Sequence, residues 1–539
     1  MTHEELFDVV QVGYGPVGQA MAALLGRHRH RVAVFERHAG LYGLPRVGGL
    51  DDEIMRILQS LSVASEFEAR TYPAQGSDFL SASGKTLAHF DWSHKGESGW
   101  DRLPLVYQPD LEDALDRAVR SQPTVELNQG WEAVRLVEHH DHVELTVEQR
   151  ETGRTRTVQA RYVVGADGAN SFVRKAAGIE WVDLGYHAQE LVIDYRPHDA
   201  EAEIAAMPDL ALVFDPAQPR FLMRRLGWKH ARWEFFLLPG EDPLEAAKAD
   251  RCWERLAPWV GPADGELIRH FVYPFESLVA ADWRRGRALL VGDSAHVMPP
   301  TMGQGVCTGI RDAAALAWKL DLVLRGAADD GLLDAYSRER KPHAEAMIGM
   351  SVELAQAWTV TDPAIAAGRD EGMLAGGEEP PPFPGLVDGV LHRDRDGQLL
   401  APAGQLFVQG PVEYGKRTGR FDDVVGQGFV VMALDADPAS LLNQEQLAFL
   451  DVIEARLVRI SGAYKPGRDV VADLRGTYTR WFRERALRAA VMRPDYYLFG
   501  TAAGREELPF VVESLRRQLC VSSAGAPRQT STKWQQAVE

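Results

Sequence analysis

The chain has 539 residues, which is long for a single hydrophobic core and predicts two or three domains. Its 59 basic and 77 acidic residues give a net charge of −18, so a polyanion such as nucleic acid is not an expected partner. No apolar run approaches the length of a membrane span and no basic leader opens the chain, which favours a cytoplasmic protein outside any membrane. The three cysteines, Cys252, Cys307 and Cys520, form no CxxC pair, so neither a disulfide framework nor a metal site is expected.

A strand, a glycine-rich turn, a helix and a second strand are predicted at the N-terminus. The strands cover residues 7–12 and 31–35, and the turn reads Gly13-Tyr14-Gly15-Pro16-Val17-Gly18. In such a turn the first glycine permits the bend, the second lets the backbone approach a pyrophosphate, and the third permits close helix packing. Glu36 follows the second strand, where a carboxylate accepts hydrogen bonds from a ribose. The unit predicts a bound dinucleotide, either FAD or NAD; a glycine turn without a ligand is the alternative.

Two later turns each follow a buried strand and open a helix. The first, residues 165–171, contains Asp167 and by itself is more typical of an aspartate that caps a helix. In the second, a strand at 288–292 leads to Asp293, and a proline-stiffened loop leads to a helix near Gly305. We expect Asp293 to bind ribityl hydroxyls. We expect the positive end of the helix to face the flavin edge that gains negative charge on reduction.

The rest of the pattern predicts an antiparallel sheet, long helices and a small C-terminal unit. Apolar and polar residues alternate between 185 and 280, which is typical of a mostly antiparallel sheet. Helices are expected over 111–120, 305–326 and 331–358, and a proline-rich stretch at 376–385 indicates a linker or surface loop. Beyond it, strands are expected at 405–409, 428–434, 456–461 and 488–499, and a helix at 507–520.

The three turns, in this order, resemble those of the class A FAD-dependent aromatic hydroxylases. Further similar segments spread over nearly the whole chain: Pro45-Arg46, Gln108-Pro109, Trp318-Lys319-Leu320, the run from Leu332 to Arg340, and Arg493-Pro494-Asp495. Within that family the chain is most similar to the 3-(3-hydroxyphenyl)propionate hydroxylases.

The resemblance implies an α/β (α+β) fold. It comprises a Rossmann-like three-layer FAD-binding domain, an inserted antiparallel-sheet substrate domain and a C-terminal thioredoxin-like domain, which here has no CxxC. Because its single cysteine is Cys520, thiol–disulfide exchange is not expected of that last domain. The expected boundaries are 1–75, 103–184 and 281–375 for the FAD-binding domain, 76–102 and 185–280 for the substrate domain, 376–400 for a linker, 401–520 for the C-terminal domain and 521–539 for a flexible tail.

The resemblance also implies a monooxygenase reaction. In that family NADH or NADPH reduces FAD, O₂ adds to the flavin C4a atom, and the hydroperoxide hydroxylates a phenolic ring such as that of a 3-hydroxyphenylpropionate-like compound. Pro299, Gly303 and Gly305 would lie at the reacting ring. The residues expected to hold FAD are Gly13, Gly15, Pro16, Val17, Gly18, Glu36, Arg37, Arg46, Gln108, Asp167, Asp293, Pro300, Gly303, Gln304, Gly305 and Val306.

A small aromatic substrate is expected between the flavin and the antiparallel sheet. A substrate carboxylate would require an arginine, and a base or hydrogen-bond acceptor should face the substrate hydroxyl, although the sequence does not identify it. The alternatives are epoxidation or Baeyer–Villiger insertion on a polyketide-like substrate, and a flavin-binding protein without turnover. A homodimer is left open. The side chains expected to form the substrate wall are Tyr195, Phe214, Arg224, Phe236, Tyr273 and Phe275.

Overall fold

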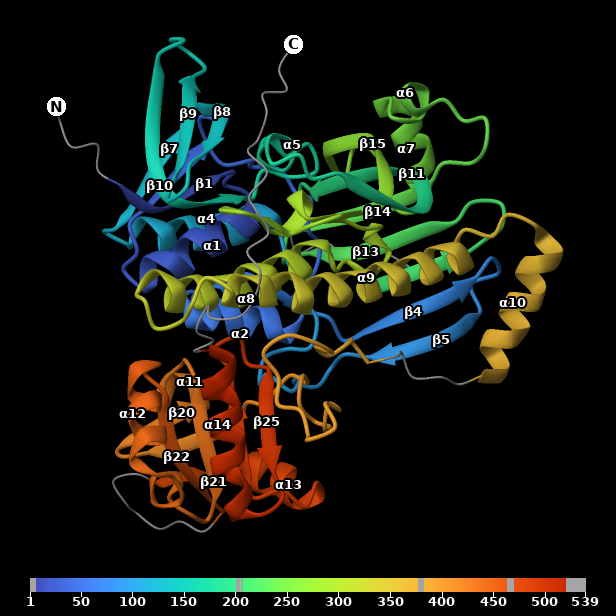
Figure 1. Ribbon diagram of the computed structural model, residues 1–539. Helices are drawn as coiled ribbons and strands as arrows, with labels where there is room; N and C mark the ends of the chain where they lie inside the picture. Colours follow the sequence, from blue (N-terminus) through green and yellow to red (C-terminus); the bar gives the residue numbers. More distant parts are fainter. Residues whose placement is uncertain (1–5, 200–203, 205–206, 377–381, 463–469, 520–539) are drawn as a thin grey trace.

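A computed structural model describes residues 6–199, 204, 207–376, 382–462 and 470–519 of the chain (Figure 1). Most strands of two large sheets lie above the long helices α8 (Gly305–Leu324) and α9 (Leu332–Trp358), although β4 and β5 of the second sheet lie below α9 in this view (Figure 1). A third sheet with its own helices lies below α8 (Figure 1). The search of the described residues for a helix long and apolar enough to cross a membrane found none. The expected tail, 521–539, lies outside the described residues.

The first sheet contains the N-terminal strand–turn–helix–strand unit. Its strand order is β16-β17-β10-β1-β2-β7, and the β8–β9 hairpin joins it through β10. β1 pairs in parallel with β2 and β10, and its near-continuous burial is typical of a parallel strand covered on both faces. The strands are β1 Phe7–Val12, β2 Val32–Glu36, β7 Val125–Gln129, β8 Trp131–Glu138, β9 Val143–Gln149, β10 Thr155–Gly165, β16 Arg284–Arg285 and β17 Ala288–Leu290.

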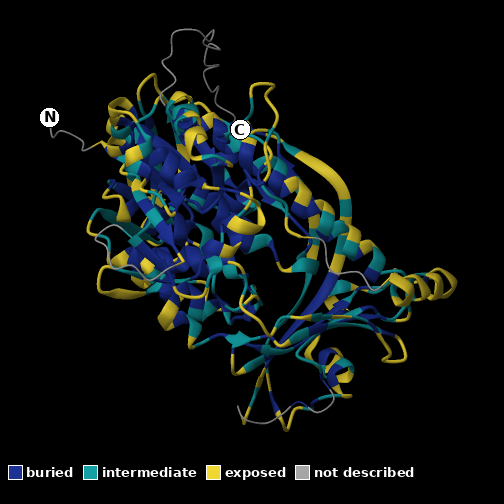
Figure 2. Ribbon diagram, turned by 90° about the horizontal axis from the view of Figure 1, so that it is seen from below, coloured by how far each residue is buried: buried dark blue, intermediate teal, exposed yellow. Residues whose placement is uncertain are grey.

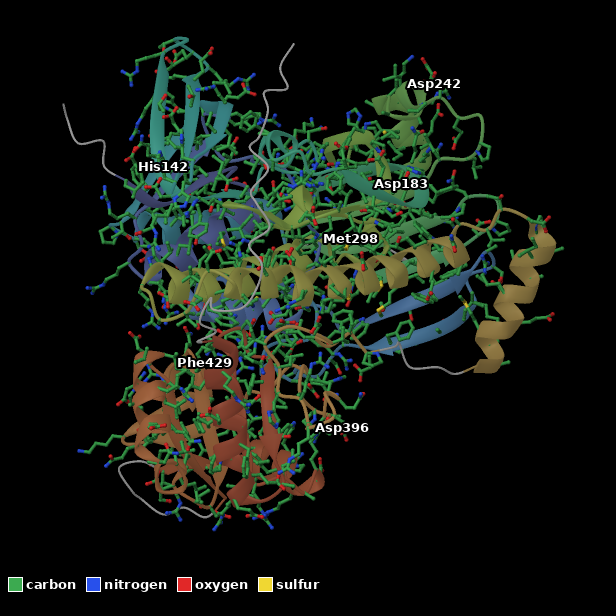
Figure 3. The ribbon with its side chains drawn as sticks, in the orientation of Figure 1. His142, Asp183, Asp242, Met298, Asp396 and Phe429 are labelled. Carbon is green, nitrogen blue, oxygen red and sulfur yellow. The ribbon has the colours of Figure 1, made fainter. Side chains whose placement is uncertain are left out.

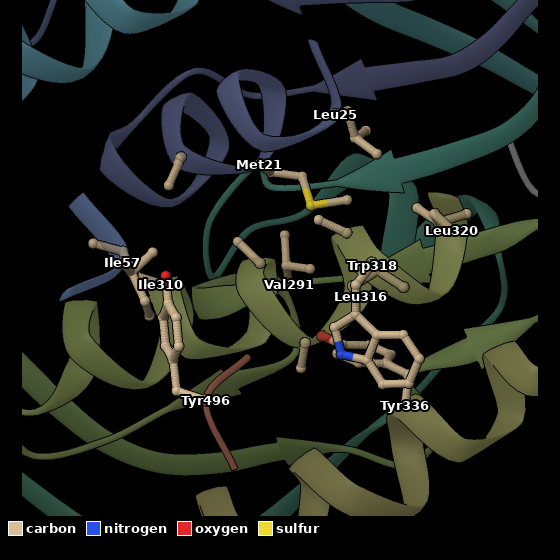
Figure 4. Packing of buried hydrophobic residues seen from close by; sticks show 14 of the residues in the cluster. Met21, Leu25, Ile57, Val291, Ile310, Leu316, Trp318, Leu320, Tyr336 and Tyr496 are labelled. Carbon is tan, nitrogen blue, oxygen red and sulfur yellow. The ribbon is translucent and has the colours of Figure 1, made fainter. Parts of the chain in front are cut away.

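Helix α1 packs against both α4 and α8 in the layer beside this sheet. Met21 and Leu25 of α1 and Ile310 and Leu316 of α8 belong to one cluster of buried apolar side chains (Figure 4). The helices approach closely because α8 has a glycine at 309, where a Cβ would lie 2.6 Å from a methyl group of α1. The helices and short strands of this part are α1 Pro16–Arg27, α2 Asp52–Ser60, α3 Ala64–Glu68, β3 Tyr72–Pro73, β6 Pro104–Leu105, α4 Gln108–Arg120, α5 Phe172–Ala176 and α8 Gly305–Leu324.

The second sheet has the order β18-β15-β11-β14-β13-β12-β4-β5 and is mostly antiparallel; β4 pairs with β12 in parallel. One face packs against α6 and α7 through a separate apolar cluster that includes Ile193, Trp233 and Leu256. The other face lines the cavity described below. The elements are β4 Gly76–Ser81, β5 Thr86–Asp91, β11 Trp181–Pro197, β12 Leu210–Phe214, β13 Arg220–Leu226, β14 His230–Phe236, α6 Pro243–Ala246, α7 Ala249–Leu256, β15 Gly265–Ala280 and β18 His296–Val297.

Helix α9 (Leu332–Trp358) connects the two sheets because it contacts α8 at one end and the second sheet at the other (Figure 1). Met347 and Ile348 of α9 pack on Met298, whose side chain lies near the middle of the molecule (Figure 3). At its C-terminal end the indole of Trp358 donates a hydrogen bond of 3.1 Å to the Val213 carbonyl of β12. Helix α10 (Pro363–Gly376) follows.

The C-terminal unit is built on a sheet of order β20-β19-β23-β22-β21-β24-β25, in which β21, β22 and β23 are parallel. Its apolar residues are continuous with the core of the first sheet, and buried residues fill the interior of both (Figure 2). The elements are β19 Pro411–Tyr414, β20 Arg417–Arg420, α11 Phe421–Val424, β21 Val430–Leu434, α12 Gln444–Val452, β22 Arg456–Ser461, β23 Val470–Asp473, α13 Thr477–Glu484, β24 Ala489–Met492, β25 Leu498–Ala502 and α14 Leu508–Leu519.

A buried ionic cluster joins the C-terminal unit to α8 and α9. Arg493 donates to both carboxylate oxygens of Glu339, at 3.0 and 2.7 Å, and to both of Asp495, at 3.0 and 2.6 Å. Lys319 donates to Glu339 at 2.6 Å, and the Trp318 indole donates to Asp495 at 2.9 Å. Every charge in this interdomain clamp has an opposite charge at hydrogen-bond distance, which offsets the cost of burying it.

One expected strand of the C-terminal half differs in the structure. Residues 405–409 pair with the C-terminal unit only through the isolated bridge between Leu406 and Tyr497, and Arg56 of the N-terminal part donates to the Phe407 carbonyl at 2.5 Å. The expected linker or surface loop has no helix or named strand over residues 382–400, although Val390 and Leu391 within it are buried; residues 377–381 lie outside the described part.

Candidate functional site

A single cavity of about 2100 Å³ extends from the N-terminal glycine turn to the inner face of the second sheet. Its walls come from β1, the turn before α1, the 40–53 segment, the N-terminus of α8, the middle of α9 and strands of the second sheet. These elements come from distant parts of the sequence and meet where the two sheets adjoin, so a ligand here would contact both.

The glycine turn combines tight packing with open space. Gly13 has φ +98°, and a Cβ there would overlap the Ala166 backbone; a Cβ at Gly18 would lie 2.6 Å from the Gly13 carbonyl. Both glycines are therefore required by the fold itself. Gly15 differs, because a Cβ there would meet no protein atom within 4 Å and Gly15 lines the cavity. The backbone is thus bare where a pyrophosphate would approach.

Two helix N-termini reach the cavity without a side-chain cap. α1 begins after Gly15 and α8 after Gln304, and at neither position does a side chain accept a hydrogen bond from the first turn. The unsatisfied N–H groups and the positive helix ends therefore favour negative charge at two places in one cavity. This arrangement fits a dinucleotide whose pyrophosphate lies at α1 and whose flavin ring lies at α8.

The acidic residues expected at the cofactor all line the cavity. Glu36 accepts from the N–H groups of Tyr14, at 2.9 Å, and His38, at 2.8 Å, which fixes the carboxylate at the end of β2. Asp167 accepts from the Ser171 hydroxyl at 2.5 Å and the Val173 N–H at 3.0 Å, so it also organises the start of α5. Burial raises the pKa of Asp167, and these hydrogen bonds oppose that shift.

Arg46 connects the cofactor side of the cavity to its substrate side. Its guanidinium lies 3.1 Å from the Asp293 carboxylate and 5.2 Å from the ring centre of Tyr273. Its carbonyl accepts a 2.7 Å hydrogen bond from Arg232 of the second sheet. The 45–49 segment therefore lies between the two halves of the cavity, held from both sides.

The other residues expected at the cofactor occupy more varied positions. The buried Gln108 amide accepts from the Val47 N–H at 2.9 Å and donates to Glu112 at 2.6 Å, so it holds the 45–49 segment in place. Gln304 accepts from the buried Arg311 at 3.1 Å. Pro299 is buried and absent from the cavity wall, in contrast to its expected position at the reacting ring. Those that do line the cavity are Pro16, Val17, Arg37, Pro300, Gly303, Gly305 and Val306.

Strand register sets the composition of the substrate side. Phe221 of β13 is opposite Glu234 of β14, and Glu234 is opposite Val192 of β11, and these three residues line the cavity. Tyr273 and Phe275 of β15, both expected in the wall, line it too. Side chains two residues apart on a strand share a face, so this row identifies which positions of each strand face the cavity.

Four expected wall residues lie elsewhere. Tyr195 faces α6 and α7, because on β11 it alternates with the cavity-facing positions. Phe214 packs against Trp358 of α9. Arg224 pairs with Asp209, its Nε lying 3.0 Å from the carboxylate. Phe236 borders a separate shallow pocket. The sequence expectation for these four is corrected. Tyr195 and Arg224 alternate with the cavity-facing positions, whereas Phe214 and Phe236 share a face with cavity-lining residues but lie beyond the end of the wall.

Sequence reasoning missed much of the wall. β4, β5 and the residue after β5 contribute an aromatic row, Phe79, Phe90 and Trp92, with neighbouring ring centres 5.0 and 6.1 Å apart. Residues 382–385 and Tyr497 close the cavity on the C-terminal side. Phe90 and Trp92, two residues apart at the end of β5, were a usable signal for the first group. No local signal marks the second group, because long-range packing brings it to the cavity.

Five charged side chains lie together on the inner face of the second sheet. Asp194 accepts from the Arg232 Nε at 2.7 Å and lies 3.5 Å from the Arg269 Nε. A carboxylate oxygen of Glu234 lies 3.6 Å from Nη1 of Arg232. Glu190 has no ion-pair partner among the described residues. Burial raises the pKa of Glu190 well above its usual value, and the proximity of Glu234 raises it further.

Comparison with known proteins agrees with this geometry. Residues 7–351 match the family model of the FAD binding domain, and residues 404–518 match the HcaD C-terminal domain. A probable NADH-specific resorcinol 4-hydroxylase of Rhodococcus jostii (strain RHA1) is 37% identical over 94% of both chains. A 3-(3-hydroxy-phenyl)propionate/3-hydroxycinnamic acid hydroxylase 2 of Burkholderia vietnamiensis (strain G4 / LMG 22486) is 32% identical over 91% of this chain and 92% of that one.

Solved structures share the fold. The flavin-dependent monooxygenase PieE, in complex with FAD and substrate, superposes with a TM-score of 0.77 at 23% identity, covering 96% of this chain and 99% of that one. Aklavinone-11 hydroxylase with FAD and aklavinone gives a TM-score of 0.76 at 23% identity, covering 96% and 100%. With its cavity, its two uncapped helix ends and these matches, the chain belongs to the class A FAD-dependent aromatic hydroxylases and is a flavin monooxygenase that uses FAD.

Proposed function

We propose that this chain hydroxylates the ring of a small phenol, with NADH as reductant and O₂ as oxidant. The observation that carries the proposal is the single cavity, which joins two uncapped helix ends to an aromatic wall. The preference for NADH over NADPH is supported by the relative from Rhodococcus jostii, whose name states it.

The residues proposed to hold FAD follow from where they line the cavity. Gly15 and the start of α1 would bind the pyrophosphate, Glu36 the adenosine ribose, and Asp293 the ribityl chain. The start of α8 after Gly303 would lie beside the isoalloxazine ring. When bound, FAD supplies the oxygen-activating chemistry, and the chain supplies orientation and shelter from water.

The substrate would lie against the aromatic row of β4 and β5 and against Tyr273 and Phe275. Aromatic side chains bury a ring at low entropic cost and hold it by offset or edge contacts. Arg46, between Asp293 and Tyr273, would fix the distance between the flavin and this wall. A misplacement of even about 1 Å lowers the rate of a positioned reaction strongly.

The test is NADH oxidation by the FAD-loaded protein with resorcinol or 3-(3-hydroxyphenyl)propionate, followed by mass analysis of the product. Stimulated oxidation with a product heavier by one oxygen atom, recovered as a further ring hydroxyl, supports the proposal. An epoxide or lactone product would instead support chemistry on a non-phenolic substrate. No oxidation of NADH or NADPH with any phenol would indicate a flavin-binding protein without turnover.

A homodimer and a cytoplasmic location stay predictions. Cys252 and Cys307 are both buried free thiols, which is compatible with a reducing compartment.

A further inference from the structure

Two buried glutamates on the cavity face of the second sheet lack hydrogen-bond donors. Oε2 of Glu190 has no partner among the described residues, and Glu190 is 1% exposed. Glu234 is 8% exposed, and its nearest cation, Arg232, is 3.6 Å away, beyond hydrogen-bond range. Buried polar groups in folded proteins are almost always satisfied, so the unpartnered oxygen of Glu190, near the cavity-lining Glu234, marks this part of the wall as a candidate ligand site.

The register of the sheet directs both glutamates inward. Between residues 190 and 194, β11 pairs with β14 without a bulge, so Glu190, Val192 and Asp194 share one face. Val192 lines the cavity, and the opposite strand places Glu234 directly beside it. Glu190 is therefore the diagonal neighbour of Glu234 on the same inner face of the sheet.

The nearby guanidinium groups are only partly engaged, since Nη2 of Arg232 and Nε of Arg269 have no hydrogen-bond partner among the described residues. Arg232 donates from Nε to Asp194 at 2.7 Å and from Nη1 to the Arg46 carbonyl at 2.7 Å. Arg269 lies 3.5 Å from Asp194. Two guanidinium groups thus face three carboxyl groups. Of the two glutamates, Glu234 is the one beside a guanidinium, so the negative charge of the pair belongs on Glu234 and the proton on Glu190.

Resting on the proposed phenol hydroxylation, we propose that Glu234, supported by Glu190, accepts the hydrogen bond of the substrate's ring hydroxyl and selects uncharged phenols over phenols with a carboxylate. A hydroxyl supplies the donor that Glu234 lacks, and a phenol whose hydroxyl is held by a carboxylate donates more electron density to its ring. A carboxylate brought to the same place would be repelled by the negative charge on Glu234.

The experiment compares wild type with Glu234→Gln, Glu234→Asp and the control Glu276→Gln. Glu276 lies on β15 and is exposed outside the cavity. Glu276→Gln therefore makes the same chemical change as Glu234→Gln at a position away from the cavity. Dissociation constants of resorcinol and 3-(3-hydroxyphenyl)propionate would be measured by flavin absorbance changes in the FAD-loaded protein. Calorimetry on the FAD-free protein would provide a readout independent of turnover.

Wild type is expected to bind resorcinol more tightly than the carboxylate-bearing phenol. Glu234→Gln should weaken resorcinol binding by about 10- to 100-fold, the usual loss for a charged hydrogen bond. It should also bring the two affinities together. Glu234→Asp, which keeps the charge but is shorter by one methylene group, should fall between wild type and Glu234→Gln, and Glu276→Gln should match wild type.

Two outcomes overturn the inference. One is resorcinol binding by Glu234→Gln within about twofold of wild type, below the loss of even a weak hydrogen bond. The other is a wild-type preference for the carboxylate-bearing phenol. If phenols stimulate NADH oxidation but either outcome is found, only the inference fails. If no phenol stimulates oxidation by wild type, the proposed function itself fails.

Discussion

Two buried charge clusters differ in how completely their members are paired. In the interdomain clamp, Arg493 binds Glu339 and Asp495, and Lys319 binds Glu339, all at hydrogen-bond distance. On the inner face of the second sheet, Glu190 and Glu234 have no hydrogen bond among the described residues. Glu339, Arg493 and Lys319 of the clamp are fully buried, and Glu190 and Glu234 of the sheet are 1% and 8% exposed.

This difference separates a structural role from a ligand-binding role. A fully paired buried cluster already has its lowest-energy arrangement without a ligand, and removal of one member leaves the others unpaired. A buried cluster with unpaired acceptors has lost hydration without gaining compensating hydrogen bonds. A ligand with donor groups would supply those hydrogen bonds. Mutations in the clamp should therefore lower the stability of the protein, and mutations in the sheet cluster should weaken ligand binding.

The largest expected effect is loss of stability in Arg493→Met. The substitution removes the single guanidinium that Glu339 and Asp495 share, leaving Lys319, the Val390 N–H and the Trp318 indole as their remaining donors. Breaking a buried ion cluster in this way costs about 3–5 kcal/mol in the free energy of unfolding. Urea unfolding followed by far-UV circular dichroism would measure it.

The control for the clamp is Arg483→Met, since Arg483 is an exposed arginine of α13 in the same C-terminal unit. It should shift the free energy of unfolding by less than about 0.5 kcal/mol. Equal stability of Arg493→Met and Arg483→Met would contradict the view that the clamp holds the two units together.

An intermediate effect is expected from the glycine turn, in which Gly13 has a structural role and Gly15 a proposed ligand-binding role. Gly13→Ala should destabilise the fold by about 2 kcal/mol, because its φ is +98° and its Cβ would overlap the Ala166 backbone. Gly15→Ala should leave the unfolding free energy within about 0.5 kcal/mol of wild type, since its Cβ would meet no protein atom.

The affinity for FAD is the second measurement that distinguishes Gly15 from Gly13. Gly15→Ala should weaken FAD binding by about tenfold or more, because the methyl group would occupy the space into which the pyrophosphate must approach. Fluorescence titration of the FAD-free protein measures it. Full FAD affinity in Gly15→Ala would remove Gly15 from the proposed cofactor site.

The sequence predicted the cofactor side of the molecule well because that side depends on local patterns. The turn at Gly13, the strand ending before Asp293 and the helix beginning at Gly305 are each specified within a few neighbouring residues. Helix and strand periodicity then placed α9 within one residue of its bounds, and β22 at its bounds. In these elements the spacing of residues in the sequence is sufficient to predict the local geometry.

The substrate side was predicted poorly because it depends on the register of the second sheet. Tyr195 and Glu190 lie on one strand, yet they face opposite sides, and only the pairing with β14 and β15 shows which side is the cavity. The strand β13 has no clear alternation in the sequence, since basic residues interrupt the apolar pattern of Arg220–Leu226. Residues 382–385 reach the cavity through contacts that no local pattern records.

The smallest expected effect is on the pH dependence of stability, and it tests the unpaired cluster alone. Burial and Glu234 raise the pKa of Glu190 in the folded protein well above its ordinary value of 4.5, with Tyr186 also nearby. The folded state then binds this proton more tightly than the unfolded state, so stability is lost as pH rises above about 4.5 towards the raised pKa. Glu190→Gln cannot titrate and should flatten this decline without lowering stability at neutral pH, in contrast to Arg493→Met. Unfolding free energies measured between about pH 5 and 8 would show it, and an unchanged slope in Glu190→Gln would mean that Glu190 is paired in solution and that the two clusters are alike.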